Sequence, residues 1–153
     1  MLRVVLVYPE IPPNTGNIAR TCAATNTELH LVEPLGFEIS DRYLKRAGLD
    51  YWPLVSLHSH SSWSAFTAFS QAQGGRYLSF STSGTTSYLQ YPFQAKDWLI
   101  FGSESKGLPP DILQACTATL RIPMAQDQVR SLNLSVSAAV ALFEASRQLG
   151  LIH

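Results

Sequence analysis

Three polar segments, each directly after a predicted strand, have the residue types best suited to bind a ligand. They are Phe80 to Gly84, Gly102 to Gly107 and Pro123 to Asn133. The carboxyl ends of parallel strands meet at one edge of a sheet, and ligands of open α/β sheets bind there. The third segment also leads into a long helix, whose first backbone amides are free to donate hydrogen bonds. We therefore expect these three loops to form one ligand site.

The second loop lacks the residues that make a nucleoside triphosphate site. Gly102 and Gly107 have the G-x-x-x-x-G spacing of a P-loop, but Leu108-Pro109 replaces the lysine and hydroxyl residue that must follow. The loop after the first strand holds prolines instead of G-x-G-x-x-G, which disfavours a dinucleotide. The remaining candidate is a ligand with a purine-like ring and modest charge. The alternative is that the glycines serve only as turn residues. The groups that could bind such a ring are backbone atoms of Phe80, Gly102, Ile122 and Leu132 and the apolar side chains of Ile122, Met124 and Leu132.

One cluster of basic residues stands out, in a predicted short helix from Ser40 to Ala47. Arg42, Lys45 and Arg46 occupy adjoining positions there. They form either a solvated surface or a contact to phosphate groups.

Histidine and cysteine residues do not form a recognisable metal motif in the sequence. The segment from His58 to Ser62 has two histidines but no cysteine and no third histidine nearby, so we interpret it as a surface loop and not as a zinc site. Cys22 and Cys116 are predicted to be reduced and mostly buried, as in a protein of the cytoplasm.

Short apolar runs, which predict strands, alternate along the chain with segments of helical pattern. This order predicts an α/β fold with a mostly parallel sheet that carries helices on both faces. The strands are expected at residues 2–8, 29–32, 51–57, 76–81, 97–101 and 119–122, and helices at 18–25, 40–47, 63–71 and from 110 to 115. The prolines at positions 9, 12 and 13 are expected to exclude regular structure there. A last helix should begin at an N-cap, Ser131 or Asn133, and end before Gly150.

The last helix is apolar nearly all the way round. Val136, Ala139, Val140 and Phe143 form one stripe at helical spacing, and small or apolar residues cover most of the rest. A helix that is hydrophobic on all sides is expected to be buried on all sides. The cover must come from the rest of the fold, from a second copy of the chain, or from both.

Length and composition predict a single domain over residues 1–153. The chain is 46% hydrophobic and 14% charged, with 11 basic and 11 acidic residues and zero formal net charge. The lack of a basic surplus disfavours broad, non-specific nucleic-acid binding, although a local basic patch remains possible. The apolar run at the N-terminus has only the length of a strand, and no run approaches the ~20 apolar residues of a membrane span. We therefore expect a cytoplasmic protein without a membrane segment.

Three ordered motifs resemble those of the SPOUT class of RNA methyltransferases. They are P-E-I-P-P-N-T-G-N-I-A-R at 9–20, I-F-G-S-E-S-K-G-L-P at 100–109, and I-P-M followed by R-S-L-N-L-S-V-S-A-A-V, within residues 122–140. The chain is most similar to the small tRNA wobble-nucleotide ribose 2′-O-methyltransferases, and E-P-L-G-F at 33–37 and R-A-G-L-D-Y at 46–51 also look like that group.

The resemblance implies an α/β knot, in which the C-terminal segment is threaded into a deep trefoil. It also implies a homodimer packed through the first and last helices, and S-adenosylmethionine as cofactor, with no metal. The residues that it assigns to the cofactor are Phe80, Thr82, Gly102, Glu104, Gly107, Ile122, Met124, Ser131, Leu132 and Asn133. For Glu104 two roles stay open, which are selection of the cationic donor over its neutral product and capping of its own loop.

The resemblance places a catalytic arginine at Arg20, with Asn14 and Asn17 near it as contacts to the tRNA. Because the chain is neutral, we expect the tRNA to be bound locally, by Arg20, Arg42, Lys45, Arg46 and Arg130. To act as a base, an arginine must first lose its proton, which at neutral pH costs on the order of 7 kcal/mol. We therefore expect Arg20 to position the RNA and stabilise negative charge on the reacting oxygen, while phosphate or water takes the proton.

The activity implied is 2′-O-methylation of the wobble cytidine or modified uridine in leucine tRNA anticodons. Two alternatives stay open. One is the same chemistry at another tRNA position or in ribosomal RNA, and the other is a knotted RNA-binding module without turnover.

Overall fold

The computed structural model describes residues 1–40, 42, 46 and 51–153. Over these residues the chain forms an α/β fold with one seven-stranded sheet of order β3-β2-β1-β6-β4-β7-β5, in which every recorded pair of neighbours is parallel. The strands are β1 (Arg3–Val7), β2 (Glu28–Val32), β3 (Leu57–His60), β4 (Tyr77–Phe80), β5 (Thr86–Ser87), β6 (Trp98–Phe101) and β7 (Ala118–Arg121). The predicted fold class is confirmed. The trefoil knot stays a prediction, because strand order alone does not test it.

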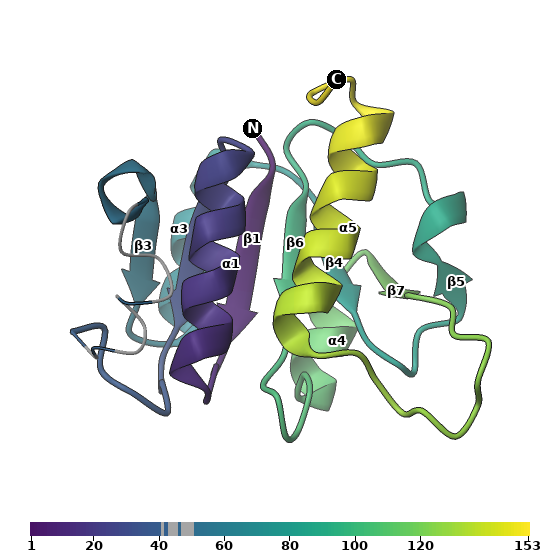
Figure 1. The fold of residues 1–153 in the computed structure, drawn as a ribbon, viewed down its shortest axis with the longest axis horizontal. Coiled ribbons are helices and arrows are strands. Elements are labelled where there is room, and N and C mark those ends of the chain that lie inside the picture. Colours follow the sequence, from purple (N-terminus) through teal and green to yellow (C-terminus); the bar gives the residue numbers. More distant parts are fainter. Residues whose placement is uncertain (41, 43–45, 47–50) are drawn as a thin grey trace.

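Helices cover both faces of the sheet (Figure 1). α1 (Pro12–Ala24) and α5 (Leu134–Gln148) lie side by side on one face, and α3 (Trp63–Gln73) and α4 (Pro110–Ala115) lie on the other. The central strands are buried on both sides, which explains their continuous apolar runs. One apolar core lies under α1 and α5, and a second, with Phe66 and Trp98, lies under α3 and α4. Within the described residues, no helix is both long and apolar enough to cross a membrane.

Two predicted elements differ from the structure. We expected residues 9–17 to be irregular, but α1 begins at Pro12, because prolines fit the first turn of a helix, where the missing amide hydrogen has no partner to lose. The strand expected at 51–57 is wrong. A short 3₁₀ helix (Trp52–Leu54) precedes β3, and β3 includes His58 and His60, which we had interpreted as loop residues.

The outer part of the sheet and the connection before β3 also depart from expectation. β5 and the 3₁₀ helix Tyr88–Gln90 were not predicted, because two-residue strands leave no periodic signal. The helix predicted from Ser40 to Ala47 falls mostly outside the described residues. Among its members, Arg42 and Arg46 are described and exposed.

The last helix is only partly covered by its own chain. Ala138, Ala141 and Ala145 are buried against the fold, whereas Val136 and Phe143 are 47% and 45% exposed. These two apolar side chains, two helical turns apart, are thus only about half covered by the described residues. The described residues therefore supply only part of the expected cover, and cover by a second copy stays a prediction.

Candidate functional site

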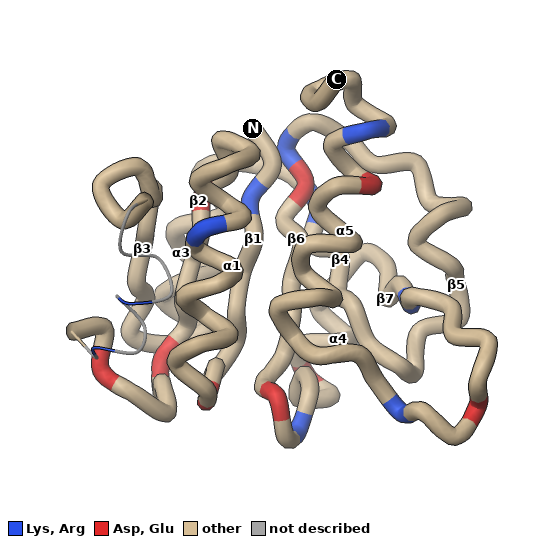
Figure 2. Tube along the Cα trace, viewed as in Figure 1, with Lys and Arg blue, Asp and Glu red and all other residues tan. Residues whose placement is uncertain are grey.

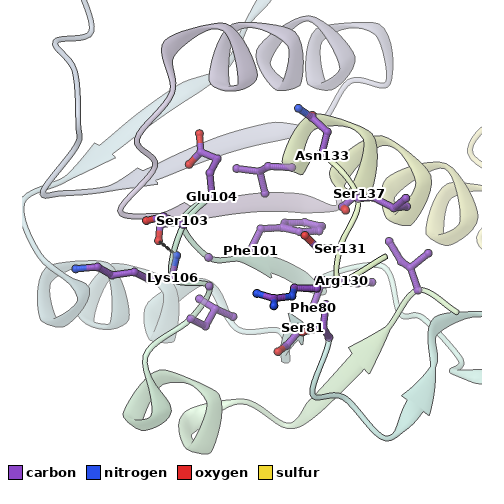
Figure 3. Close-up of a pocket in the computed structure, with 18 of the residues that line it drawn as sticks. Phe80, Ser81, Phe101, Ser103, Glu104, Lys106, Arg130, Ser131, Asn133 and Ser137 are labelled. Carbon is purple, nitrogen blue, oxygen red and sulfur yellow. Dashed lines mark hydrogen bonds between the residues drawn. The ribbon is translucent and has the colours of Figure 1, made fainter. Parts of the chain in front are cut away.

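The loops that follow β1, β4, β6 and β7 meet at the carboxyl edge of the sheet and enclose a cavity of about 710 Å³. β1 and β6 are neighbours, but the chain leaves them in opposite directions along the sheet, toward β2 and toward β7. Such a reversal opens a crevice between the loops. Figure 3 shows the side chain of Phe101 between the loop that carries Glu104 and the segment that carries Ser131 and Asn133, with Phe80 below it, beside Arg130.

Every residue assigned to the cofactor from the sequence lines this cavity. They are Phe80, Thr82, Gly102, Glu104, Gly107, Ile122, Met124, Ser131, Leu132 and Asn133. Three loops separated by up to fifty residues thus contribute to one space, as the sequence predicted. Their role toward a cofactor stays a prediction at this point, since geometry shows only where they lie.

The cavity has further walls that the sequence reasoning missed. Phe101, the last residue of β6, stacks on Phe80, the last residue of β4, with ring centroids 4.9 Å apart. The two residues are direct partners in the parallel register, so their position could have been derived once the strand order was known. The other lining residues that were missed are Ile11, Ser81, Ser83, Ser103, Ser105, Lys106, Leu108, Leu113, Leu134 and Ser137. Most of them lie within or beside the predicted loops, which is the one signal that could have included them.

Glu104 joins the loop after β6 to the segment that enters α1. Its Oε1 accepts a hydrogen bond from the Glu10 amide at 2.9 Å, and its Oε2 accepts from the Ile11 amide at 2.8 Å and from Asn14 Nδ2 at 3.2 Å. Amides at the start of a helix have no helical partner, and an anion suits the positive end of the helix dipole. Glu104 therefore caps α1 from a distant loop. This contact differs from the capping of its own loop that we had considered.

A reciprocal contact strengthens the same junction. Glu10 Oε1 accepts hydrogen bonds from the amide and the hydroxyl of Ser105, at 2.9 and 2.7 Å. These hydrogen bonds to Ser105 lower the pKa of the Glu10 carboxyl, because they favour its charged form. Two carboxylates thus bridge the two loops in opposite directions.

Asn14 links this junction to the last helix. While its Nδ2 donates to Glu104, its Oδ1 accepts from Asn133 Nδ2 at 3.1 Å. Asn133 Oδ1 accepts in turn from the Ser135 amide at 2.8 Å, which makes Asn133 the N-cap of α5 and decides between the two predicted caps. Asn14 is buried and lines the cavity, although the sequence placed it with the RNA contacts.

Arg20 does not line the cavity. It is exposed on the outer face of α1, which it shares with Asn17, as their spacing predicted. Its guanidinium lies 4.6 Å from the ring centroid of Tyr51 and donates from Nη2 to the Tyr51 hydroxyl at 3.3 Å. In the chain as it stands, Tyr51 orients this arginine.

The other predicted RNA-binding cations are spread over two places. Arg130 lines the cavity beside Ser131, and Arg42 and Arg46 are exposed near the connection to β3. Lys45 lies outside the described residues. Figure 2 shows acidic and basic residues interspersed along the described chain, which agrees with the neutral composition.

The lining of the cavity fits S-adenosylmethionine. Phe80, Ile122 and Met124 offer apolar surface for an adenine ring, and the loops supply backbone donors and acceptors. Its volume lies within the range of small-molecule sites, roughly 300–1,000 Å³. The glycine at 102 is required by the loop itself, because a Cβ there would stand 2.1 Å from the carbonyl carbon of Gly107.

Comparison with known proteins identifies relatives over the whole chain. A model of the SpoU rRNA Methylase family matches residues 1–143. The tRNA (cytidine(34)-2'-O)-methyltransferase of Saccharophagus degradans is 49% identical over 98% of this chain and 97% of its own. A Synechocystis protein, provisionally given the same name, is 61% identical over 97% of each chain.

Solved structures agree. One described as "Structural insights into the 2-OH methylation of C/U34 on tRNA" is 51% identical, covers 98% of this chain and 97% of its own, and superposes with a TM-score of 0.92. An AdoMet-bound rRNA methyltransferase from Sinorhizobium meliloti is 27% identical, with a TM-score of 0.88 over 97% of this chain and 56% of its own.

Proposed function

Because the chain belongs to the SpoU rRNA Methylase family, we propose that it is an S-adenosylmethionine-dependent tRNA methyltransferase that modifies the ribose 2′-hydroxyl of the wobble pyrimidine. The observation that carries the proposal is the cavity, in which ten residues assigned from the sequence come together at the carboxyl edge of the sheet. Relatives that share nearly the full length bear that activity in their names, and one shares 61% of its residues with this chain.

The cofactor would be held by all three loops. Phe80, Ile122 and Leu132 would pack against the adenine, while backbone groups of the loop from Gly102 would bind its polar edges. When bound, S-adenosylmethionine supplies a methyl group already activated on a sulfonium. The carboxylate of Glu104 is engaged by three donors, so its task is to hold the loops together rather than to face the sulfonium directly.

The ribose must be brought to the cavity in line with the methyl group, and cations on the surface of this chain would do so. Arg20 would orient the nucleotide and stabilise the charge that develops on the 2′-oxygen, while its proton passes to phosphate or water. Arg130 lines the cavity and could bind the same nucleotide, and Arg42 and Arg46, together with Lys45, would bind the anticodon arm. Asn17 lies on the exposed face of α1 with Arg20 and would contact the ribose or phosphate beside it.

We also propose a homodimer packed through α1 and α5. The exposed apolar pair Val136 and Phe143 lies on the outer face of α5, next to α1, and burial of both in a second copy would remove apolar surface from water. Sedimentation equilibrium should give twice the chain mass of 16.9 kDa. A Phe143→Glu variant should have the mass of one chain. The proposal would be overturned if the unaltered protein and the variant had the same mass.

The two unpaired cysteines accord with a reducing compartment, and we expect the protein to act in the cytoplasm. Leucine tRNAs are the expected substrates.

The activity is tested with S-adenosylmethionine carrying a labelled methyl group and a leucine tRNA transcript. Label should enter the transcript and should be lost when nucleotide 34 carries a 2′-deoxyribose. Equal labelling of both transcripts would favour another RNA position, and absence of label from all RNA would favour the non-catalytic module.

A further inference from the structure

Four side chains with metal-ligand chemistry lie on one face of the sheet at its β3 edge. Glu28 and His30 alternate along β2, and His58 and His60 alternate along β3. Side chains two residues apart in a strand point to the same face. The parallel register pairs His30 with His58, so the four side chains gather on a single face.

The geometry is that of a connected cluster. His30 Nε2 lies 3.1 Å from Glu28 Oε2, and His30 Nδ1 lies 2.9 Å from His60 Nε2. The ring of His58 stacks on that of His30, with centroids 4.5 Å apart. One ligand atom each from Glu28, His30 and His58 lies within 4.8 Å of the other two.

Burial gives the cluster a closed side and an open side. His30 is fully buried, with Phe66 and Trp98 in edge-on contact with its ring. The Glu28 side chain is 29% exposed and His58 is half-buried, so an ion can reach their ligand atoms from solvent. Arg3, on the adjoining strand, donates hydrogen bonds to the carbonyl oxygens of Gly74 and Lys96. Its charge also acts on Glu28, while the carboxylate oxygen Oε2 of Glu28 is hydrogen-bonded to His30.

We propose that Glu28, His30 and His58 form a binding site for a transition-metal ion of the zinc type, with His60 as the partner that orients His30. Two imidazoles and one carboxylate are a donor set that suits zinc, with water in the fourth position. The ion would replace the hydrogen between His30 Nε2 and Glu28. His30 Nδ1–H would then donate to His60 Nε2, as the second nitrogen of a metal-bound histidine does in known sites.

Binding requires one side chain to move. Ligand atoms of a tetrahedral zinc site, at bond lengths of about 2.0–2.1 Å, lie roughly 3.4 Å apart, so the His58 ring must leave its stacked position and turn toward Glu28. His58 is on an edge strand and half-buried, which gives it room to turn. The bound ion would join β3 to β2 and stabilise the edge that follows the segment carrying Tyr51. It has no part in methyl transfer.

The test is metal binding by the purified full chain, freed of metal beforehand. Zinc titration by calorimetry should give one equivalent per chain, and cobalt should give the visible absorption of a four-coordinate site. His58→Ala and Glu28→Gln should each weaken binding by at least about tenfold. His153→Ala is the matched control, because His153 is the one histidine outside the cluster and is exposed, and its affinity should equal that of the unaltered chain.

Thermal unfolding provides a second measurement. Zinc should raise the melting temperature of the unaltered chain and of His153→Ala, and should have little effect on His58→Ala, since only the folded state binds. Circular dichroism checks that each variant is folded. Undetectable binding, an affinity that His58→Ala and Glu28→Gln leave unchanged, or a thiolate-to-cobalt band from Cys22 or Cys116 would overturn the proposal.

Discussion

Asn14 and Glu104 are separated by 90 positions in the chain, yet Asn14 Nδ2 donates a hydrogen bond to Glu104 Oε2 across 3.2 Å. The same amide group accepts from Asn133, which caps α5. The loops after β1 and β6 and the start of α5 are therefore one hydrogen-bonded unit around the cavity. A change of Asn14, Glu104 or Asn133 should therefore alter the geometry of the whole cavity that is proposed for the cofactor.

Replacement of Glu104 by glutamine should loosen this unit. The new amide group would face three donors with only one acceptor oxygen, and we expect a loss of about 1 to 2 kcal/mol in the free energy of unfolding. The affinities for S-adenosylmethionine and for S-adenosylhomocysteine, measured by calorimetry, should fall by the same factor. Glu38→Gln, an exposed carboxylate outside the cavity lining, is the control. A selective loss of affinity for the cationic donor would contradict the clamp and restore charge selection as the role of Glu104.

The two glycines of the β6–α4 loop should respond differently to alanine. In Gly102→Ala the new Cβ would meet backbone atoms at 2.1 and 2.3 Å, so the loop must shift, at a cost of about 1 to 3 kcal/mol and with loss of most cofactor affinity. Gly107 has a φ of +66° but open space around a Cβ, so Gly107→Ala should cost about 1 kcal/mol in strain and keep most of the affinity. Calorimetry and thermal unfolding of both variants check this order. Equal affinities in the two would show that close packing at Gly102 is unimportant.

Tyr51 should act through Arg20. Arg20→Ala should abolish methyl transfer and change cofactor affinity by no more than a few-fold, because Arg20 lies outside the cavity lining. Tyr51→Phe keeps the stacked ring and loses only the long hydrogen bond, so it should reduce kcat less than Tyr51→Ala. Lys96→Ala removes an exposed cation just before β6, at the amino ends of the strands and so opposite the cavity. This variant should leave kcat and KM unchanged. A full-rate Arg20→Ala enzyme would remove Arg20 from the mechanism.

The two thiols should be poorly reactive in the folded protein. Burial raises the pKa of Cys22 to about 12 and that of Cys116 to about 11, because it disfavours the thiolate. At pH 8 the fraction of Cys22 that is thiolate is then about ten times smaller than that of Cys116. The labelling rate of both should keep rising with pH beyond pH 9, where the rate for an exposed thiol levels off. Labelling with a disulfide reagent, followed by peptide mapping, measures both rates. Fast labelling of Cys22 in the native protein at neutral pH would contradict its burial.

Local signals predicted much of this molecule. The bounds of α4 and the positions of the central strands follow from runs and caps that span few residues. The ten residues assigned to the cofactor came from the resemblance to a known family, and all of them line the cavity. The links from Glu104 to Ile11 and from Asn14 to Asn133 could not be derived from such local signals, since they depend on which strands are neighbours. The histidine cluster was missed for the same reason. His30 and His58 meet only through the register of β2 and β3, and that register has no sequence motif.

The last helix shows a second limit of prediction from the sequence. Its composition indicated cover on every side, but composition does not distinguish cover by the same chain from cover by a second copy. Val136 and Phe143 are exposed in the single chain. This exposed pair is the surface that the proposed homodimer would bury.

The most direct measurement is the mapping of the methylated nucleoside in total tRNA after incubation with the protein and S-adenosylmethionine. Digestion and mass spectrometry should find one new 2′-O-methylated pyrimidine at position 34 of leucine tRNAs, and none with the Arg20→Ala variant. A methyl group on a base, at another position or in ribosomal RNA alone would contradict the proposed function.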